Sequence, residues 1–294
     1  MFNINYKDAH CLEIKNTLNT NCAKINLAHG GQLSALTINA CTIIEDLEPL
    51  DYKHTYASSI LFPFANRIQD GTYSFNDKLY EFSINEPSQN NAIHGLVYDK
   101  TFKVLQTETT KDFALVKLIY NAINKPDGFP YAYTIILEYT FYKMHTVLKV
   151  TIKNTDIKTF PFTLGWHPYF ISKNLNASTL QFNSSKKVVF DDRMITKKVE
   201  NVETTSVKIE NQQLDDCWFL NDTKVNFITP DYTLELTSSE ADSFLQVYTP
   251  PRKNTIAIEP TTGISNSFNN NIGLKTLKPN NSYQITWSLK LHKS

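Results

Sequence analysis

The feature that most constrains the fold is an alternation of apolar and polar residues with a period of two, interrupted roughly every 8 to 12 residues by turn-forming residues. Residues 71–84 read GTYSFNDKLYEFSI, with aromatic and polar residues alternating on both sides of Asn76 and Asp77. Asn and Asp tolerate the left-handed backbone of a tight turn. This segment therefore predicts a β-hairpin.

The same pattern continues along the chain, rich in β-branched and aromatic residues, which favour strands over helices. Every candidate window for a long amphipathic helix is interrupted by Pro, Gly, Asn or a β-branched run. The sequence thus predicts one large all-β antiparallel domain over residues 1–294, a sandwich or a barrel. Its further expected strands are residues 112–123, 133–142, 146–154, 186–190, 232–238, 244–250, 255–260 and 283–291.

Composition limits the class of partner. The chain has 29 basic and 29 acidic residues and a formal net charge of zero, so it has no global attraction for nucleic acid or for an anionic membrane surface. A small neutral molecule fits this balance better. The four cysteines, none of them in a CxxC pair or beside a histidine cluster, are interpreted as reduced thiols. No signal peptide and no apolar run of about 18 residues is found, which predicts a soluble, cytoplasmic protein without nucleic-acid or membrane partners.

Two polar residues interrupt strand patterns just before a proline. In FTLGWHP, His167 shares its face with Thr163 and Gly165, which leaves room in front of the imidazole. In TIAIEP, Glu259 follows an apolar run, and a glutamate is almost never fully buried without a partner. We expect both strands to end at their prolines. The alternatives are a hydrogen-bonded core histidine and a salt bridge at the rim of the sheet.

Three other positions carry candidate functional groups. Arg67 follows an aromatic and proline-rich bend, and its planar fork of donors suits either a ligand or nearby loop carbonyls. His94 precedes Gly95, where a tight turn can leave the ring exposed, although it can also be an ordinary surface histidine. Asp215 and Asp216 point to opposite sides of an extended segment, so at most one faces a given cleft.

Together, these histidines and carboxylates are compatible with a metal site. However, the chain has no HxH or HExxH spacing, and an arginine would repel a bound cation. We therefore favour a metal-free general acid and base site that hydrogen-bonds to a polyol.

Six segments occur in this order along the chain: NRIQDGTYSFNDKLYEFSINE, NAIHGLVYDK, PFTLGWHPYF, LDDCW, LQVYTP and IAIEPTTGISNSF. Together they resemble the aldose 1-epimerase (galactose mutarotase) family. The resemblance implies a large antiparallel β-sandwich of the galactose mutarotase type, an open cleft, and interconversion of the α and β anomers of a free aldose without any cofactor.

The resemblance also implies roles for individual residues. Glu259 matches the general base, which takes the proton of the C1 hydroxyl, and His167 matches the general acid, which protonates the ring oxygen. His94 is similar to a second histidine near the ring oxygen. Arg67 and Asp216 resemble groups that hold sugar hydroxyls.

The form GWHPYF, followed by Ile171, is more similar to the shorter and less characterised branch of the family than to its galactose-specific members. A related branch acts on hexose 6-phosphates, and Arg193, Arg252 or cleft lysines could then bind the phosphate. A non-catalytic carbohydrate-binding module is the alternative from a different functional class. The oligomeric state and the preferred sugar stay open.

Overall fold

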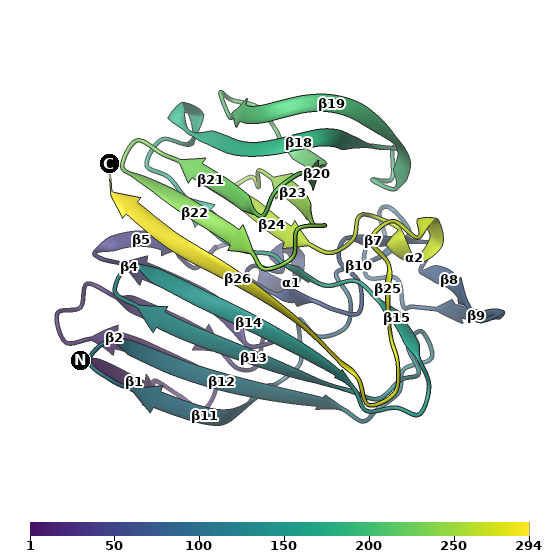
Figure 1. The fold of residues 1–294 in the computed structure, drawn as a ribbon, viewed down its shortest axis with the longest axis horizontal. Coiled ribbons are helices and arrows are strands. Elements are labelled where there is room, and N and C mark those ends of the chain that lie inside the picture. Colours follow the sequence, from purple (N-terminus) through teal and green to yellow (C-terminus); the bar gives the residue numbers. More distant parts are fainter. Residues whose placement is uncertain (294) are drawn as a thin grey trace.

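The regular secondary structure of the protein consists almost entirely of antiparallel strands (Figure 1). The structure, a computed structural model, describes residues 1–293. An N-terminal sheet pairs its five strands in chain order. These strands are β1 (Phe2–Tyr6), β2 (Cys11–Asn16), β3 (Cys22–Asn26), β4 (Gln32–Ile38) and β5 (Cys41–Ile44).

A much larger sheet follows, in the order β11-β12-β13-β14-β26-β22-β21-β18-β20-β23-β24-β16-β6, with β17 on β24 and β19 on β18. Its strands are β6 (Ile60–Leu61), β11 (Lys103–Thr109), β12 (Phe113–Ala122), β13 (Tyr133–Tyr142), β14 (His145–Asn154), β16 (Gly165–Trp166), β17 (Tyr169–Ile171), β18 (Thr179–Phe190), β19 (Thr196–Lys208), β20 (Asp215–Leu220), β21 (Lys224–Ile228), β22 (Tyr232–Ser238), β23 (Phe244–Tyr248), β24 (Thr255–Thr261) and β26 (Ser282–Lys293).

Three two-stranded ribbons and three very short helices complete the chain, so the absence of a long helix is confirmed for the described residues. The ribbons are β7 (Arg67–Gln69) with β10 (Asn91–Ile93), β8 (Thr72–Phe75) with β9 (Lys78–Glu81), and β15 (Phe160–Phe162) with β25 (Lys275–Leu277). The helices are α1 (Tyr52–Thr55), α2 (Ser267–Asn270) and a 3-10 turn (Leu175–Ala177). None of the described helices is long and apolar enough to cross a membrane.

The period-two pattern of the sequence is the burial pattern of the strands. Along β13, buried and half-buried residues alternate over the whole strand, and β14 repeats this almost throughout. The predicted hairpin at Asn76 and Asp77 forms, with both residues at positive φ (49° and 60°). The prediction of an all-β antiparallel fold is confirmed.

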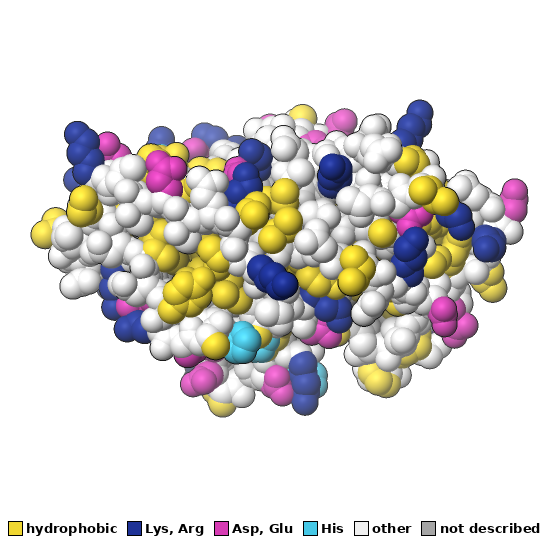
Figure 2. All heavy atoms as spheres, turned by 90° about the horizontal axis from the view of Figure 1, so that it is seen from below, with side chains coloured by type: hydrophobic (Ala, Val, Ile, Leu, Met, Phe, Trp, Pro, Cys, Tyr) yellow, Lys and Arg dark blue, Asp and Glu magenta, His cyan; other side chains and the backbone are white. Residues whose placement is uncertain are grey.

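One continuous core joins the two sheets. Ile14 and Leu36 from the N-terminal sheet belong to the same buried cluster as Val116 and Leu137 from the large sheet. Farther along the large sheet, the long strand β18 pairs with β19 along one edge. Along its other edge, one part of β18 pairs with β21 and the next part with β20. This branch carries the sheet on to β20, β23, β24 and β16, the strands on which the candidate site lies. Figure 2 shows acidic, basic and apolar side chains interspersed over one face.

Candidate active site

The centre of the site is a gap in the large sheet. β16 pairs with β24 at Gly165 and Thr261, and β17 keeps the same antiparallel register against β24. This register places His167, which lies between β16 and β17, directly opposite Glu259. Residues opposite each other in an antiparallel pair point to the same face. The two side chains therefore meet, with 3.4 Å between His167 Nε2 and Glu259 Oε1, and both are buried.

Proline explains the gap, and it also corrects one expectation. β24 does not end before Pro260 but continues to Thr261. Backbone N–H groups on either side of Pro260 donate to the residues that directly precede β17 and β16: Ile258 to the Pro168 carbonyl at 3.2 Å and Thr262 to the Leu164 carbonyl at 2.8 Å. The position between them has no N–H to donate. The missing hydrogen bond lies opposite Trp166, the last residue of β16. The strand β16 therefore ends before Pro168, as predicted.

His94 reaches the same place from a turn. It follows β10, its φ is +61°, and Gly95 continues the turn at φ +75°. A Cβ at Gly95 would lie 2.2 Å from the Phe62 carbonyl oxygen, so only glycine fits there. The turn buries the ring of His94, contrary to the exposed ring that its loop suggested, and sets it edge-on to His167 with ring centroids 4.9 Å apart.

Arg67 begins β7, whose pairing with β10 sets it opposite Ile93, one residue before His94. Its guanidinium binds Glu86 through two nitrogens, with Nε 2.9 Å from Oε2 and Nη2 2.8 Å from Oε1. A third nitrogen, Nη1, donates to Asn66 Oδ1 at 3.3 Å. Arg67 thus lies in the site, held by a carboxylate that the sequence did not single out.

The structure brings Asp215, and not Asp216, into the cavity. Gln246 faces Glu259 across β23 and β24, and Asp215 lies on the same face of the next strand. The Asp215 carboxylate accepts a hydrogen bond from Gln246 Nε2 at 2.7 Å. Asp216 points to the other face, where its Oδ1 lies 2.6 Å from Lys187 Nζ. The place in the cavity that was expected of Asp216 is therefore occupied by Asp215.

Asn66 and Gln246 also line the cavity, and the sequence analysis did not single out either of them. Asn66 Nδ2 donates to Gln246 Oε1 at 3.2 Å, which links the Arg67 side of the cavity to Asp215. Tyr169 stacks on His167 with ring centroids 4.9 Å apart and planes 11° from parallel. The signal that could have found Gln246 is its place in the LQVYTP segment, a polar residue within an apolar strand. Asn66 comes from a loop, whose position the strand pattern does not fix, whereas Tyr169 begins β17.

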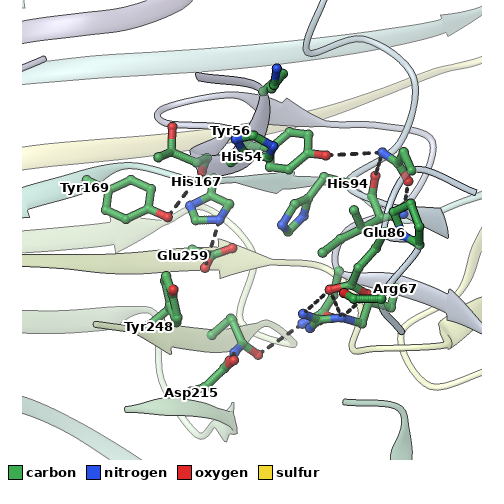
Figure 3. Close-up of a pocket in the computed structure, with 18 residues that line it drawn as sticks. His54, Tyr56, Arg67, Glu86, His94, His167, Tyr169, Asp215, Tyr248 and Glu259 are labelled. Carbon is green, nitrogen blue, oxygen red and sulfur yellow. Dashed lines mark hydrogen bonds and ion pairs between the residues drawn. The ribbon is translucent and has the colours of Figure 1, made fainter. Parts of the chain in front are cut away.

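The cavity has a volume of about 510 Å³. One of its walls is formed by the large sheet, with Asp215 on β20, Glu259 on β24 and His167 between β16 and β17. The other is formed by loops around Tyr56, Glu86 and His94 (Figure 3). Its lining residues are Lys53, His54, Thr55, Tyr56, Asn66, Arg67, Asn85, Glu86, Pro87, Ser88, Ile93, His94, His167, Tyr169, Asp215, Gln246, Tyr248 and Glu259.

Burial dominates the electrostatics of the site. Desolvation lowers the pKa of His167 to about 3 and that of His94 well below its usual value. The same cause raises the pKa of Glu259 well above that of an ordinary glutamate, and the charge of Asp215 adds to this increase. Burial also raises the pKa of Asp215 to about 6, against an opposing effect of Arg67. Burial therefore favours the uncharged form of the central pair, a neutral His167 imidazole beside a protonated Glu259 carboxyl group.

Such an arrangement suits proton transfer, because an acid and a base with opposite shifts of pKa face one cavity at contact distance. Among the described residues, no group of three or more His, Cys, Asp or Glu side chains is arranged to hold a metal ion. The site contains polar groups that can bind hydroxyls on both sides of the central pair.

Comparisons with known proteins identify the family of the chain. The family model described as aldose 1-epimerase matches residues 10–290. An uncharacterised Escherichia coli protein, YihR, is 24% identical over 275 residues, which span 88% of this chain and 87% of that protein.

Solved structures share the fold. A galactose mutarotase-like protein from Clostridium acetobutylicum superposes with a TM-score of 0.88 at 22% identity, covering 100% of this chain and 99% of that one. A galactose 1-epimerase from Lactobacillus acidophilus superposes with a TM-score of 0.81 at 15% identity, covering 100% and 98%. The architecture is that of the galactose mutarotase-like β-sandwiches, and the chain belongs to the aldose 1-epimerase family.

Proposed function

We propose that the protein is a cofactor-independent aldose 1-epimerase that interconverts the α and β anomers of a free aldose. The observation that carries the proposal is the His167 and Glu259 pair, 3.4 Å apart at the wall of a cavity of about 510 Å³. A cavity of this size accommodates a monosaccharide. The paired groups supply the acid and the base that opening of a sugar ring requires.

In the proposed reaction, the Glu259 carboxylate takes the proton from the C1 hydroxyl while His167 gives its Nε2 proton to the ring oxygen. The electrons of the O1–H bond form the C1 carbonyl, and those of the bond between C1 and the ring oxygen pass to that oxygen. The open-chain aldehyde turns about the bond from C1 to C2. The two proton transfers then run in reverse and close the ring on the other face.

The charge state of the pair fits this cycle. Before ring opening, the pair is a Glu259 carboxylate beside a His167 imidazolium. After ring opening, it is a protonated Glu259 beside a neutral His167. Both states of the pair hold the same number of protons, because one proton is taken from the sugar and one is given to it. Burial favours the neutral pair. The environment of Glu259 and His167 therefore stabilises the open-chain stage, which is the high-energy intermediate of anomer exchange.

Around this pair, the remaining groups are proposed to fix the sugar. The Asp215 carboxylate accepts hydrogen bonds from hydroxyls, and the free N–H groups of Arg67 donate to them. The Gln246 amide donates to Asp215 at 2.7 Å and accepts from Asn66 at 3.2 Å. These two hydrogen bonds fix the Asp215 carboxylate and the Asn66 amide at the cavity wall. The neutral ring of His94, beside His167, is placed to donate to the ring oxygen or to a neighbouring hydroxyl.

The test is polarimetry or anomeric exchange NMR with freshly dissolved α-glucose, α-galactose and a panel of other aldoses. We expect the purified protein to accelerate equilibration of at least one aldose above the buffer rate. A protein that leaves every aldose at the buffer rate is not a mutarotase. Calorimetric binding of a sugar without anomer exchange would instead identify a non-catalytic carbohydrate-binding module.

A further inference from the structure

The ion pair between Arg67 and Glu86 removes the net charge of the one arginine that lines the cavity among the described residues. Two guanidinium nitrogens bind the carboxylate at 2.8 and 2.9 Å, and the side chains are only 14% and 18% exposed. Shielded from water, such a pair is screened little by salt. A ligand in the cavity therefore meets a neutral pair rather than a free cation.

The other basic side chains do not compensate. Lys53 lines the rim of the cavity, but its side chain is 68% exposed and its Nζ lies 3.2 Å from Asp51 Oδ2. Arg193 and Arg252 pair with acidic residues of their own, at distances of 2.8 and 2.9 Å, and neither is among the residues that line the cavity. Both arginines thus lack the position that a phosphate-binding role would need.

The acidic groups of the cavity, in contrast, are only partly balanced. Asp215 has no basic side chain among its hydrogen-bond partners in the described part of the chain; its partner is the Gln246 amide. Glu259 faces His167, whose burial favours the neutral ring. The wall formed by the sheet is consequently neutral to negative, and this disfavours an anionic sugar.

From this arrangement we propose that Glu86 is a selectivity residue: by neutralising Arg67, it makes the cavity accept uncharged aldoses and reject sugars that carry an anionic group. The inference rests on the proposed function. A guanidinium has five N–H donors, and the contacts to Glu86 and Asn66 engage only three of its N–H groups. Arg67 can therefore still donate hydrogen bonds to hydroxyls, without offering a net positive charge.

The expected size of the effect follows from Coulomb's law. At an effective dielectric constant of about 20, a unit charge about 8 Å away changes an equilibrium or a rate by roughly 30-fold. Replacing Glu86 by Gln leaves Arg67 with an unopposed charge. The preference for neutral over anionic sugars should then fall by about 10- to 30-fold.

A pH profile gives a second, independent readout. The positive charge of Arg67 lowers the pKa of Asp215 and Glu259, and it also disfavours protonation of His94 and His167. Removing the opposing charge of Glu86 should strengthen these effects. The acidic limb of the kcat/KM profile should move to lower pH in Glu86→Gln, a change that loss of packing alone would not produce. The other basic residues that line the cavity, Lys53 and His54, are present in both proteins and so do not contribute to the difference between their profiles.

The experiment measures anomeric exchange of glucose, glucuronate and glucose 6-phosphate by wild type, Glu86→Gln and Glu45→Gln. Glu45→Gln is the matched control, because it removes one negative charge from the Arg252 ion pair outside this cavity. We expect wild type to prefer glucose at least 10-fold, Glu86→Gln to lose most of that preference, and Glu45→Gln to keep it.

Two outcomes would overturn the inference: wild type that turns over the anionic sugars as well as glucose, or an unchanged preference in a folded Glu86→Gln variant. If Glu86→Gln does not fold, the variants Arg67→Gln and Arg67→Gln with Glu86→Gln replace it. The single change should widen the preference, and the double change should restore the wild-type value. Wild type that acts on no aldose at all contradicts the proposed function instead.

Discussion

His167 and Glu259 face each other across a gap in an otherwise continuous antiparallel ladder, with Nε2 and Oε1 3.4 Å apart. Backbone pairing on both sides of the gap fixes the distance between them. The acid and the base proposed for this site are thus positioned by the sheet itself, and their contact does not depend on a mobile loop.

Replacing Glu259 by Gln should reduce kcat by about 100- to 10,000-fold, because the amide keeps the shape of the side chain but cannot accept the C1 proton. Polarimetry with the best aldose of the panel measures the loss. Circular dichroism and thermal unfolding serve as controls for the fold. Activity close to that of wild type in a folded variant would remove Glu259 from the role of base.

Asp215→Asn and Asp216→Asn form a matched pair of adjacent substitutions. The first should lower kcat/KM by roughly 10- to 100-fold, because a charged acceptor for sugar hydroxyls is lost. The second should change kcat/KM less than about twofold, because Asp216 pairs with Lys187 on the other face of the strand. Steady-state kinetics of both variants shows which of the two carboxylates binds the sugar. A larger loss of kcat/KM in Asp216→Asn than in Asp215→Asn would identify Asp216 as the substrate ligand.

The kcat/KM of wild type should fall as the pH drops below about 6. Burial raises the pKa of Asp215 to about 6, so its carboxylate becomes protonated in this range and can no longer accept as a charged group. Anomeric exchange measured between pH 4.5 and 8 tests this expectation. In Asp215→Asn the limb near pH 6 should be absent, and a limb that persists in that variant would belong to another group.

The same shift predicts that Asp215→Asn increases stability at alkaline pH. A carboxyl whose pKa is higher in the folded than in the unfolded state binds its proton more tightly when folded, so ionisation costs folding free energy. The variant should be more stable than wild type by about 1 to 3 kcal/mol above pH 6. The difference should shrink as the pH falls and disappear below about pH 4, which urea unfolding at several pH values can measure. An unchanged difference at all pH values would contradict this cause.

Gly95→Ala should destabilise the protein by about 2 kcal/mol or more. The position has φ +75°, and the new Cβ would lie 2.2 Å from the Phe62 carbonyl oxygen. Gly165→Ala is the comparison, because its Cβ meets only side-chain atoms, the nearest at 3.0 Å, and its loss of stability should be smaller. Thermal unfolding compares the two, and activity losses in Gly95→Ala would report the displacement of His94.

The alternation of residue types predicted strands such as β13, β14 and β22 well, because each of them buries one face against the core. It did not predict β19, β20 or β21. Residues 133–142 and 146–154 form the expected hairpin of β13 and β14, the second strand beginning one residue earlier. The N-terminal sheet was not predicted, because the alternation in strands such as β2 is blurred: Leu12, Glu13 and Ile14 are all buried in succession.

The candidate site shows where such reasoning stops. Counting faces along a strand correctly separated Asp215 from Asp216, but choosing between them needs the register between β20, β23 and β24, which a single sequence does not contain. Similarly, the role of Pro260 depends on an interruption in a neighbouring strand almost a hundred residues away. Glu86 was missed because its place beside the cavity depends on contacts with Arg67 and Asn91, which the strand pattern does not predict.

The two walls of the cavity differ in how freely they can change. An insertion or deletion between Gly165 and Tyr169 would move His167 out of register with Glu259, whereas the loops around Tyr56 and Glu86 can be lengthened or exchanged without touching that register. Directed evolution toward a new sugar should therefore concentrate its libraries on the loop wall. The proposed acid and base both lie on the sheet wall, so the loop wall can be redesigned while their contact is retained.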